Sequence, residues 1–222
     1  MTDGRSVVVA ELFSAGGGFG QLVALKTPAG CEVRHCDDEV LRATDLKSVA
    51  CEEVGEIAKY DDKVVYRPLK TAPNLRHGWR LHCQDEDELR WVIDQIYPGR
   101  IAALDNHRRG DLKTTSLRET LDRQSGMYKA AARISEEEVD DLVGRFCRSD
   151  DGCLRTILWK RDRSDAIPSS KLTATKFDPT VDQTGKGRKV APLICQEACN
   201  FLVAAAREAV KIREGEKVTF GH

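Results

Sequence analysis

The chain has 222 residues, with 35 Lys and Arg against 36 Asp and Glu, and its formal net charge is −1. This length allows one large domain or two small ones. The balanced charge argues against a dedicated nucleic-acid-binding protein, because such proteins usually carry a strong basic excess. A mean hydropathy of −0.45 argues against an integral membrane protein, and no apolar run approaches the roughly 18–20 residues that a bilayer span requires.

Cysteine is the unusual component, with eight residues in a chain that has only two methionines. The first thirteen residues carry charges around a four-residue apolar run, which is not the pattern of a secretory signal or a transit peptide. We therefore expect a cytoplasmic protein with reduced thiols. In that compartment clustered cysteines more often serve metal or redox chemistry than disulfides.

The first half of the chain alternates short apolar runs with helical patterns. Residues 7–10 form an apolar run that predicts a buried strand, and the glycine-rich residues 14–20 predict a turn rather than a dinucleotide-binding fingerprint. Helices are predicted at residues 46–58, after the candidate N-cap Thr44, and at residues 85–97, before Pro98-Gly99. The other predicted strands are residues 21–25, 32–35, 64–66 and 79–82.

The second half carries its own helix signals. Ser116 with Glu119, and Ser135 with Glu138, have the spacing of capping boxes and predict two helix starts. Further predicted elements are strands at residues 128–134 and 153–159, a polar loop at 160–189 and an alanine-rich helix at 195–212. We expect an α/β (α+β) fold with two small domains, a mixed sheet with helices in residues 1–112 and a helix-rich domain in residues 113–222.

Four cysteines form two ordered pairs in the second half. Cys147 and Cys153 are separated by five residues, and Cys195 and Cys199 by three. The pattern predicts Cys147 at the end of one helix and the second pair on the first turn of the last helix, where side chains at i and i+4 share a face. A helix N-terminus favours the negative charge that cluster-bound thiolates carry.

Four thiolates suit either zinc or an iron–sulfur cluster. Structural zinc sites usually contain C-x2-C knuckles, and no such knuckle occurs in this chain. The spacing therefore favours a [4Fe–4S] cluster over zinc, whereas buried small apolar side chains are the interpretation that needs no metal. The same spacing is similar to the [4Fe–4S] ligand pattern of sirohaem-containing sulfite and nitrite reductases.

The remaining candidates have simpler interpretations. Residues 34–38 gather titratable groups, and a solvated strand end explains them more simply than a polar ligand site. The irregular spacing of the other four cysteines is typical of ordinary buried or edge thiols; they are Cys31, Cys36, Cys51 and Cys83.

Basic residues flank the first cysteine pair, and the nearest are Arg148 and Arg155. Guanidinium groups pair well with carboxylates, so these residues are candidates for binding an anionic tetrapyrrole or an acidic partner surface. A solvated loop explains them equally well. Further along the same stretch are Lys160, Arg161 and Arg163.

Several blocks resemble a known family. LRETLDRQSGMYKAAARI (residues 117–134), CRSDDGCLRTILW (147–159) and CQEACNFLVAAARE (195–208) are similar to the C-terminal iron–sulfur domain of a multidomain, CbiX-like sirohydrochlorin cobaltochelatase family. EVRHCDDE (32–39) and YRPLKTAPNLRHGWRL (66–81) resemble the stabilising domain that precedes it. The resemblance implies a stabilising domain in residues 1–112 and a cluster-binding domain in residues 113–222. By it, the [4Fe–4S] ligands are Cys147, Cys153, Cys195 and Cys199.

The resemblance also implies a function. We expect an accessory or electron-transfer protein in tetrapyrrole metallation and cobalamin synthesis, acting with a CbiX-like cobaltochelatase or another tetrapyrrole enzyme. The paired histidines and acidic residue of the chelatase site have no evident counterpart here, and no base–nucleophile arrangement supports free-standing activity. The alternative is a structural or interaction module whose fold is stabilised by zinc or by a redox-silent cluster at the four-cysteine site. Neither expectation involves nucleic acid or a membrane.

Overall fold

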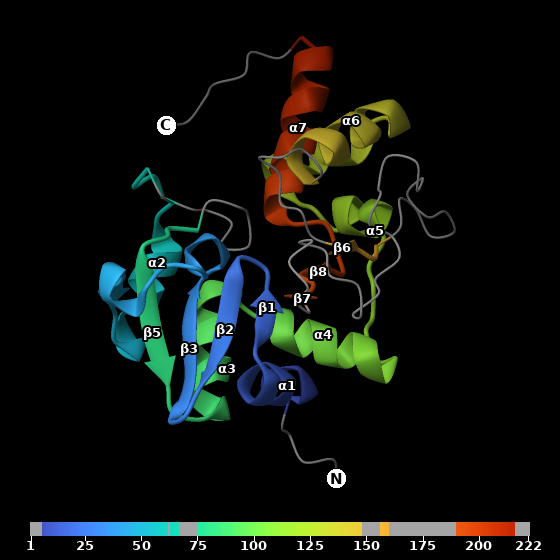
Figure 1. The fold of residues 1–222 in the computed structure, drawn as a ribbon. Helices are drawn as coiled ribbons and strands as arrows, with labels where there is room; N and C mark the ends of the chain where they lie inside the picture. Colours follow the sequence, from blue (N-terminus) through green and yellow to red (C-terminus); the bar gives the residue numbers. More distant parts are fainter. Residues whose placement is uncertain (1–5, 62, 67–74, 148–155, 160–189, 216–222) are drawn as a thin grey trace. The chain divides into compact units, whose positions relative to one another are not determined.

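The computed structural model describes residues 6–61, 63–66, 75–147, 156–159 and 190–215. These residues divide into two compact units (Figure 1). One unit contains the described residues up to Leu112 and from Val190 to Leu193, and the other contains those from Lys113 to Trp159 and from Ile194 onward. The expected α/β class, a mixed sheet with helices, is confirmed. Among the helices of these residues, none has the length and apolar character needed to cross a membrane.

A six-stranded mixed sheet forms the centre of the first unit, in the order β4-β5-β3-β2-β1-β7. The four central strands pair antiparallel, whereas β4 and β7 pair parallel with their neighbours at the two edges. The last strand comes from far along the chain, since Gly18 lies opposite Val190. The strands are β1 (Gly17–Phe19), β2 (Leu22–Thr27), β3 (Gly30–His35), β4 (Lys47–Ser48), β5 (Trp79–Cys83) and β7 (Val190–Ala191).

Two glycines permit close approaches within this sheet. A Cβ atom on Gly18 would lie 2.9 Å from a methyl group of Val190, and one on Gly30 would lie 2.2 Å from the carbonyl oxygen of Cys83. Glycine is the usual residue where another backbone or side chain approaches this closely. A larger residue at either position would force β7 or β5 to shift.

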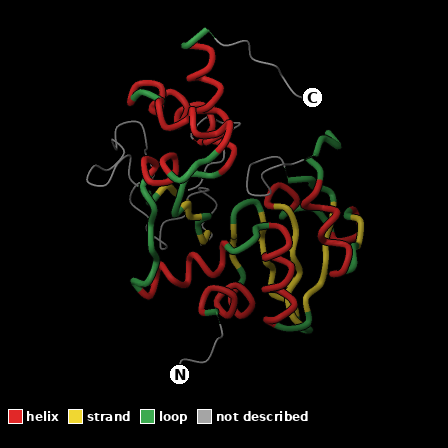
Figure 2. The backbone as a smooth tube through the Cα atoms, turned by 180° about the vertical axis from the view of Figure 1, so that it is seen from behind, coloured by secondary structure: helices red, strands yellow, loops and turns green. Residues whose placement is uncertain are grey.

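Helices cover one face of the sheet, as Figure 2 shows from behind. The amphipathic helix predicted before Pro98 is confirmed as α3, and its N-cap Asp85 accepts a hydrogen bond from the backbone N–H of Glu88 at 2.9 Å. The sequence pattern did not indicate α4, which begins directly after Gly99 and is followed by its C-cap Gly110. The helices are α1 (Val7–Ala15), α2 (Val54–Lys59), α3 (Glu86–Ile96) and α4 (Arg100–Arg109).

Three predicted elements of the first unit are wrong. Residues 7–10 begin helix α1 rather than a strand, and the Ser6 side chain caps this helix by accepting from the N–H of Val9 at 3.2 Å. A short apolar run does not distinguish a buried strand from a buried helix. The helix expected from residue 46 begins only at Val54, because residues 47–48 pair with β5 instead. The predicted strand at residues 64–66 is reduced to a single bridge between Tyr60 and Tyr66.

The second unit is a set of helices around one apolar core, whose most buried members include Leu121 and Val203. Both predicted capping boxes are confirmed: Ser116 and Glu119 bond reciprocally, and so do Ser135 and Glu138. A short parallel pair of strands completes the unit. Its elements are α5 (Leu117–Asp122), the 3-10 helix η4 (Gly126–Arg133), α6 (Glu136–Cys147), β6 (Thr156–Ile157), β8 (Ile194–Cys195) and α7 (Asn200–Arg213).

Two predicted elements of the second unit are also corrected. Residues 128–134 mostly form the 3-10 helix η4 rather than a strand, because this segment packs on α7, where the Arg207 guanidinium lies 4.6 Å from the ring centre of Tyr128. The last helix begins at Asn200 instead of residue 195, because residues 194–195 pair with β6. Pairing between distant segments thus overrides the local helical pattern.

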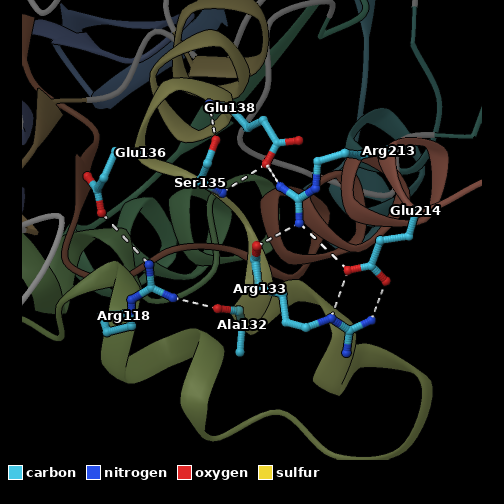
Figure 3. A network of polar contacts seen from close by, with 8 residues as sticks. All are labelled: Arg118, Ala132, Arg133, Ser135, Glu136, Glu138, Arg213 and Glu214. Carbon is cyan, nitrogen blue, oxygen red and sulfur yellow. Dashed lines mark hydrogen bonds and ion pairs between the residues drawn. The ribbon is translucent and has the colours of Figure 1, made fainter.

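A polar network joins the end of α7 to the start of α6 (Figure 3). The Arg213 guanidinium donates to the Glu138 carboxylate and to the backbone carbonyl of Arg133 at 2.8 Å. The Arg133 guanidinium in turn makes two hydrogen bonds to Glu214, at 3.0 and 2.7 Å, and these lower the pKa of that carboxyl. The network fixes the pairing of the two helices that carry candidate cysteines.

Candidate metal centre

Two helix ends meet at an aromatic contact. Cys147 is the last residue of α6, and Cys199 is the N-cap of α7. The adjacent rings of Phe146 and Phe201 pack edge to face, with their centroids 5.1 Å apart. This contact brings the C-terminal end of α6 to the N-terminal end of α7, and with them two of the predicted ligands.

Cys195 reaches the same region on a strand. It lies opposite Ile157 in the β6–β8 pair, and its carbonyl accepts a hydrogen bond from the N–H of Leu158 at 2.9 Å. Its thiol donates to the carbonyl of Glu197 at 3.0 Å. Cys195 and Cys199 therefore do not share the first turn of a helix, as predicted, because strand pairing draws Cys195 out of the helix.

Three thiols lie at the edge of one apolar core. Cys147, Cys195 and Cys199 are half-buried, and all three pack against the core of the second unit. Half-buried thiols keep sulfur accessible to a metal while the core fixes their backbone. The core thus brings together three of the four predicted ligands.

The other predicted site residues lie outside the described residues. They are Cys153, Arg148 and Arg155, with the further basic residues Lys160, Arg161 and Arg163.

The three sulfur atoms at the core edge do not form a compact group of donor atoms. Among the described residues, only the donor atoms of His35, Cys36 and Asp37 form a group within 4.8 Å of one another. The three sulfurs at the core edge are therefore spread more widely. A single zinc ion holds tetrahedral thiolates about 3.8 Å apart on bonds of ~2.3 Å.

The surroundings fit an anionic cluster. No acidic residue lies in the described first turn of α7, and the Cys199 side chain makes no capping hydrogen bond there. The partial positive charge of this helix end is thus available to thiolates. The indole N–H of Trp159 is buried, with the residue 2% exposed, and it finds no hydrogen-bond partner among the described residues. Hydrogen-bond donors around cluster sulfurs are a usual feature of iron–sulfur sites.

Two family models match consecutive parts of the chain. The model described as "DR2241 stabilising domain" matches residues 9–108, and the one described as "4Fe-4S iron-sulfur cluster binding domain" matches residues 109–208. Together the two matches place a region similar to the DR2241 stabilising domain before a region similar to a 4Fe-4S cluster-binding domain. The second match contains all four cysteines of the two ordered pairs. The cofactor is therefore a [4Fe–4S] cluster, as the spacing favoured.

The same two-domain arrangement occurs in a solved structure. The chain is similar to DR2241 from Deinococcus radiodurans, described as a multi-domain protein with structural similarity to chelatases and two additional novel domains. The two share 27% sequence identity with a TM-score of 0.73, and the match covers 92% of this chain. It covers 40% of DR2241, so the chain spans about two-fifths of that protein's length. None of the curated proteins matches the chain.

Cysteines also gather in the stabilising domain. Cys31 and Cys83 lie directly opposite each other in the β3–β5 pair, and both are 0% exposed. The hydrogen bond between the two thiols lowers the pKa of Cys31 and raises that of Cys83. Cys51 is half-buried beside them, and its thiol donates to the carbonyl of His82 at 3.4 Å. Their sequence spacing did not indicate this grouping, because the strand register creates it.

The segment at residues 34–38 is more buried than predicted. Arg34, His35 and Asp38 are buried, so the interpretation as a solvated strand end is wrong. The His35 ring accepts a hydrogen bond from the N–H of Asp37 at 3.1 Å, which caps the short 3-10 helix η1 (Cys36–Asp38). This capping explains why the side chains of His35, Cys36 and Asp37 lie together.

Proposed function

We propose that this pair of domains is an accessory [4Fe–4S] protein of tetrapyrrole metallation, acting with a CbiX-like cobaltochelatase in cobalamin synthesis. One observation carries the proposal: three half-buried thiols lie at one core edge in a chain that is similar to two-fifths of a multidomain protein with structural similarity to chelatases. The family models that match this chain are described as a stabilising domain and a cluster-binding domain, and neither is described as a chelatase domain.

The chemistry of the site supports a redox role. A [4Fe–4S] cluster supplies one-electron transfer when bound. Cys147, Cys195 and Cys199 hold it, with Cys153 as the fourth ligand, and their partial burial leaves the centre near the surface, where a partner can approach. Cobalt is a metal whose oxidation state matters for its insertion and its later handling, so a one-electron centre beside a chelatase is chemically sensible.

The basic residues support a contact with substrate or partner. Arg148 directly follows Cys147, and Arg155 stands two residues after Cys153. Planar guanidinium groups pair with carboxylates, which an anionic tetrapyrrole or an acidic protein surface supplies. We assign these two residues to that role.

The test begins with protein purified anaerobically. We expect about four irons per chain and a broad absorption near ~400 nm that bleaches on reduction. Titration with sirohydrochlorin should change the spectrum of the tetrapyrrole, and the double variant Arg148→Ala, Arg155→Ala should weaken this binding at least about tenfold, which corresponds to ~1.4 kcal/mol.

Each alternative has its own outcome. Stoichiometric zinc without iron would exclude the redox role and favour the structural module. A cluster that no physiological donor reduces would favour a redox-silent structural centre. A reducible cluster with no response to sirohydrochlorin or to the cobaltochelatase would leave an electron-transfer protein and remove the link to metallation.

A further inference from the structure

Trp159 carries a buried polar group without a partner. The residue is 2% exposed, and its Nε1 atom finds no hydrogen-bond partner in the part of the chain that the structure describes. A buried donor without a partner is expensive, and native proteins keep few of them without a reason. Trp79, another buried tryptophan, shows the usual arrangement, because its indole N–H donates to the carbonyl of Arg76.

Trp159 lies beside a cluster ligand along the chain. It follows Leu158, whose N–H donates to the carbonyl of Cys195 at 2.9 Å. Ile157, two residues earlier, is the strand partner of Cys195. Trp159 also belongs to the apolar core against which Cys195 and the other described ligands pack.

The other orphaned donor of this unit has a different setting. The Nε atom of Arg207 is also buried without a hydrogen bond to the described residues. Its guanidinium nevertheless lies over Tyr128 and contacts the sulfur of Met127, two turns along α7 from Cys199. Within the described part of the chain, the nitrogen of Trp159 has no such compensating contact, which makes a bound group the simplest partner for it.

We propose that the Trp159 indole N–H donates a hydrogen bond to a sulfur atom of the bound [4Fe–4S] cluster or of its cysteine ligands. The inference rests on the cluster assignment and adds a residue that positions and tunes it. A donor beside sulfur favours the more negative, reduced form, so Trp159 raises the reduction potential.

The test is Trp159→Phe in the full chain, loaded anaerobically. We expect the iron content to be retained and the midpoint potential to become more negative. At a fixed ambient potential, the ratio of reduced to oxidised cluster should fall by up to about tenfold, which is 59 mV for a one-electron couple. Trp79→Phe is the matched control, and it should leave the potential unchanged.

The apo protein supplies a second readout. Both variants lose the volume of the larger indole ring, so the comparison between them isolates the effect of the N–H group. Apart from that shared loss of volume, removing the unpaired donor in Trp159→Phe should leave the apo Tm unchanged or raise it. Trp79→Phe loses a satisfied hydrogen bond, so this variant should have a lower apo Tm. If Trp159→Phe fails to hold the cluster, replacing Trp159 with the isosteric benzothienylalanine removes only the N–H. An unchanged potential in that protein would overturn the proposal.

Failure of the cluster assignment and failure of the proposed role of Trp159 give different results. Wild-type protein without iron would remove the cluster assignment itself. Wild-type protein with a cluster, and a Trp159→Phe or isosteric variant with the same potential, would remove only the role of Trp159. In that case the indole N–H bonds to another group, such as an ordered water molecule.

Discussion

The two groups of cysteines show how the same side chain serves two purposes. In the stabilising domain, Cys31 and Cys83 lie inside a sheet, are fully buried and satisfy each other's hydrogen bonding. In the cluster-binding domain, Cys147, Cys195 and Cys199 lie where a helix or strand ends or begins, and each is half-buried. A fully buried thiol is fixed by the side chains around it, whereas a half-buried thiol can turn toward a ligand.

The largest contrast is expected from removing one thiol of each group. Cys195→Ala should abolish cluster retention, because it removes a ligand and the remaining thiolates cannot complete the site. Iron analysis and the absorption near ~400 nm measure the loss. Cys83→Ala should retain the full iron content and lower the free energy of unfolding by about 1–2 kcal/mol, the cost of a small cavity in a core. The reverse pattern would mean that the ligands were chosen wrongly.

Alkylation of the apo protein sharpens the same comparison. Iodoacetamide should modify Cys147, Cys195 and Cys199 in the folded protein, since their side chains are partly exposed. Cys31 and Cys83 should react slower by a factor on the order of 10³ or more, because they are exposed only when the chain unfolds. Peptide mass spectrometry after timed quenching gives the rates. Equal rates for both groups would contradict the burial argument, and urea provides the control in which all five react.

Acid should weaken the cluster-binding domain slightly through Glu214. The hydrogen bonds from Arg133 lower the pKa of the Glu214 carboxyl in the folded state. The ionised carboxylate therefore stabilises the fold fully above the pKa of an unfolded glutamate, about 4.3. This stabilisation is lost as the pH falls through the lower pKa of the folded state. Unfolding midpoints of the apo protein between about pH 6 and pH 3 measure the effect. Glu214→Gln should flatten this dependence, whereas Glu137→Gln, at an exposed position in α6, should not. If the unfolding midpoint of Glu214→Gln depends on pH as strongly as that of the wild type, the network in Figure 3 has no role in the acid sensitivity.

Local signals were sufficient for part of the fold. The capping boxes at Ser116 and Ser135 each predicted a helix start that the structure contains, and Asp85 opens the predicted α3. The β2–β3 hairpin also follows from its sequence, since strands were predicted at residues 21–25 and 32–35, separated by only six residues. In each case the deciding contacts lie within a few residues of one another.

Several of the missed features share a physical cause, which is contact between segments far apart in the sequence. Residues 194–195 continue the helical pattern of α7, yet they pair with β6, and this partner lies far away in the sequence. Cys31 and Cys83 meet through strand register rather than spacing. The four cluster ligands were predicted from spacing and family resemblance, whereas the geometry that brings Cys147 to Cys199 depends on the contact of Phe146 with Phe201.

The order in which the chain is synthesised places a condition on the assembly of both domains. The strand β7 pairs with β1 through Val190 and Gly18, so the first sheet lacks this edge strand until the residues up to Val190 have been synthesised. Cys195 and Cys199 follow β7 within ten residues. This strand of the sheet and two of the predicted cluster ligands therefore emerge from the ribosome together, and since domains generally fold as units during synthesis, we expect completion of the sheet and cluster loading to become possible at the same stage of synthesis.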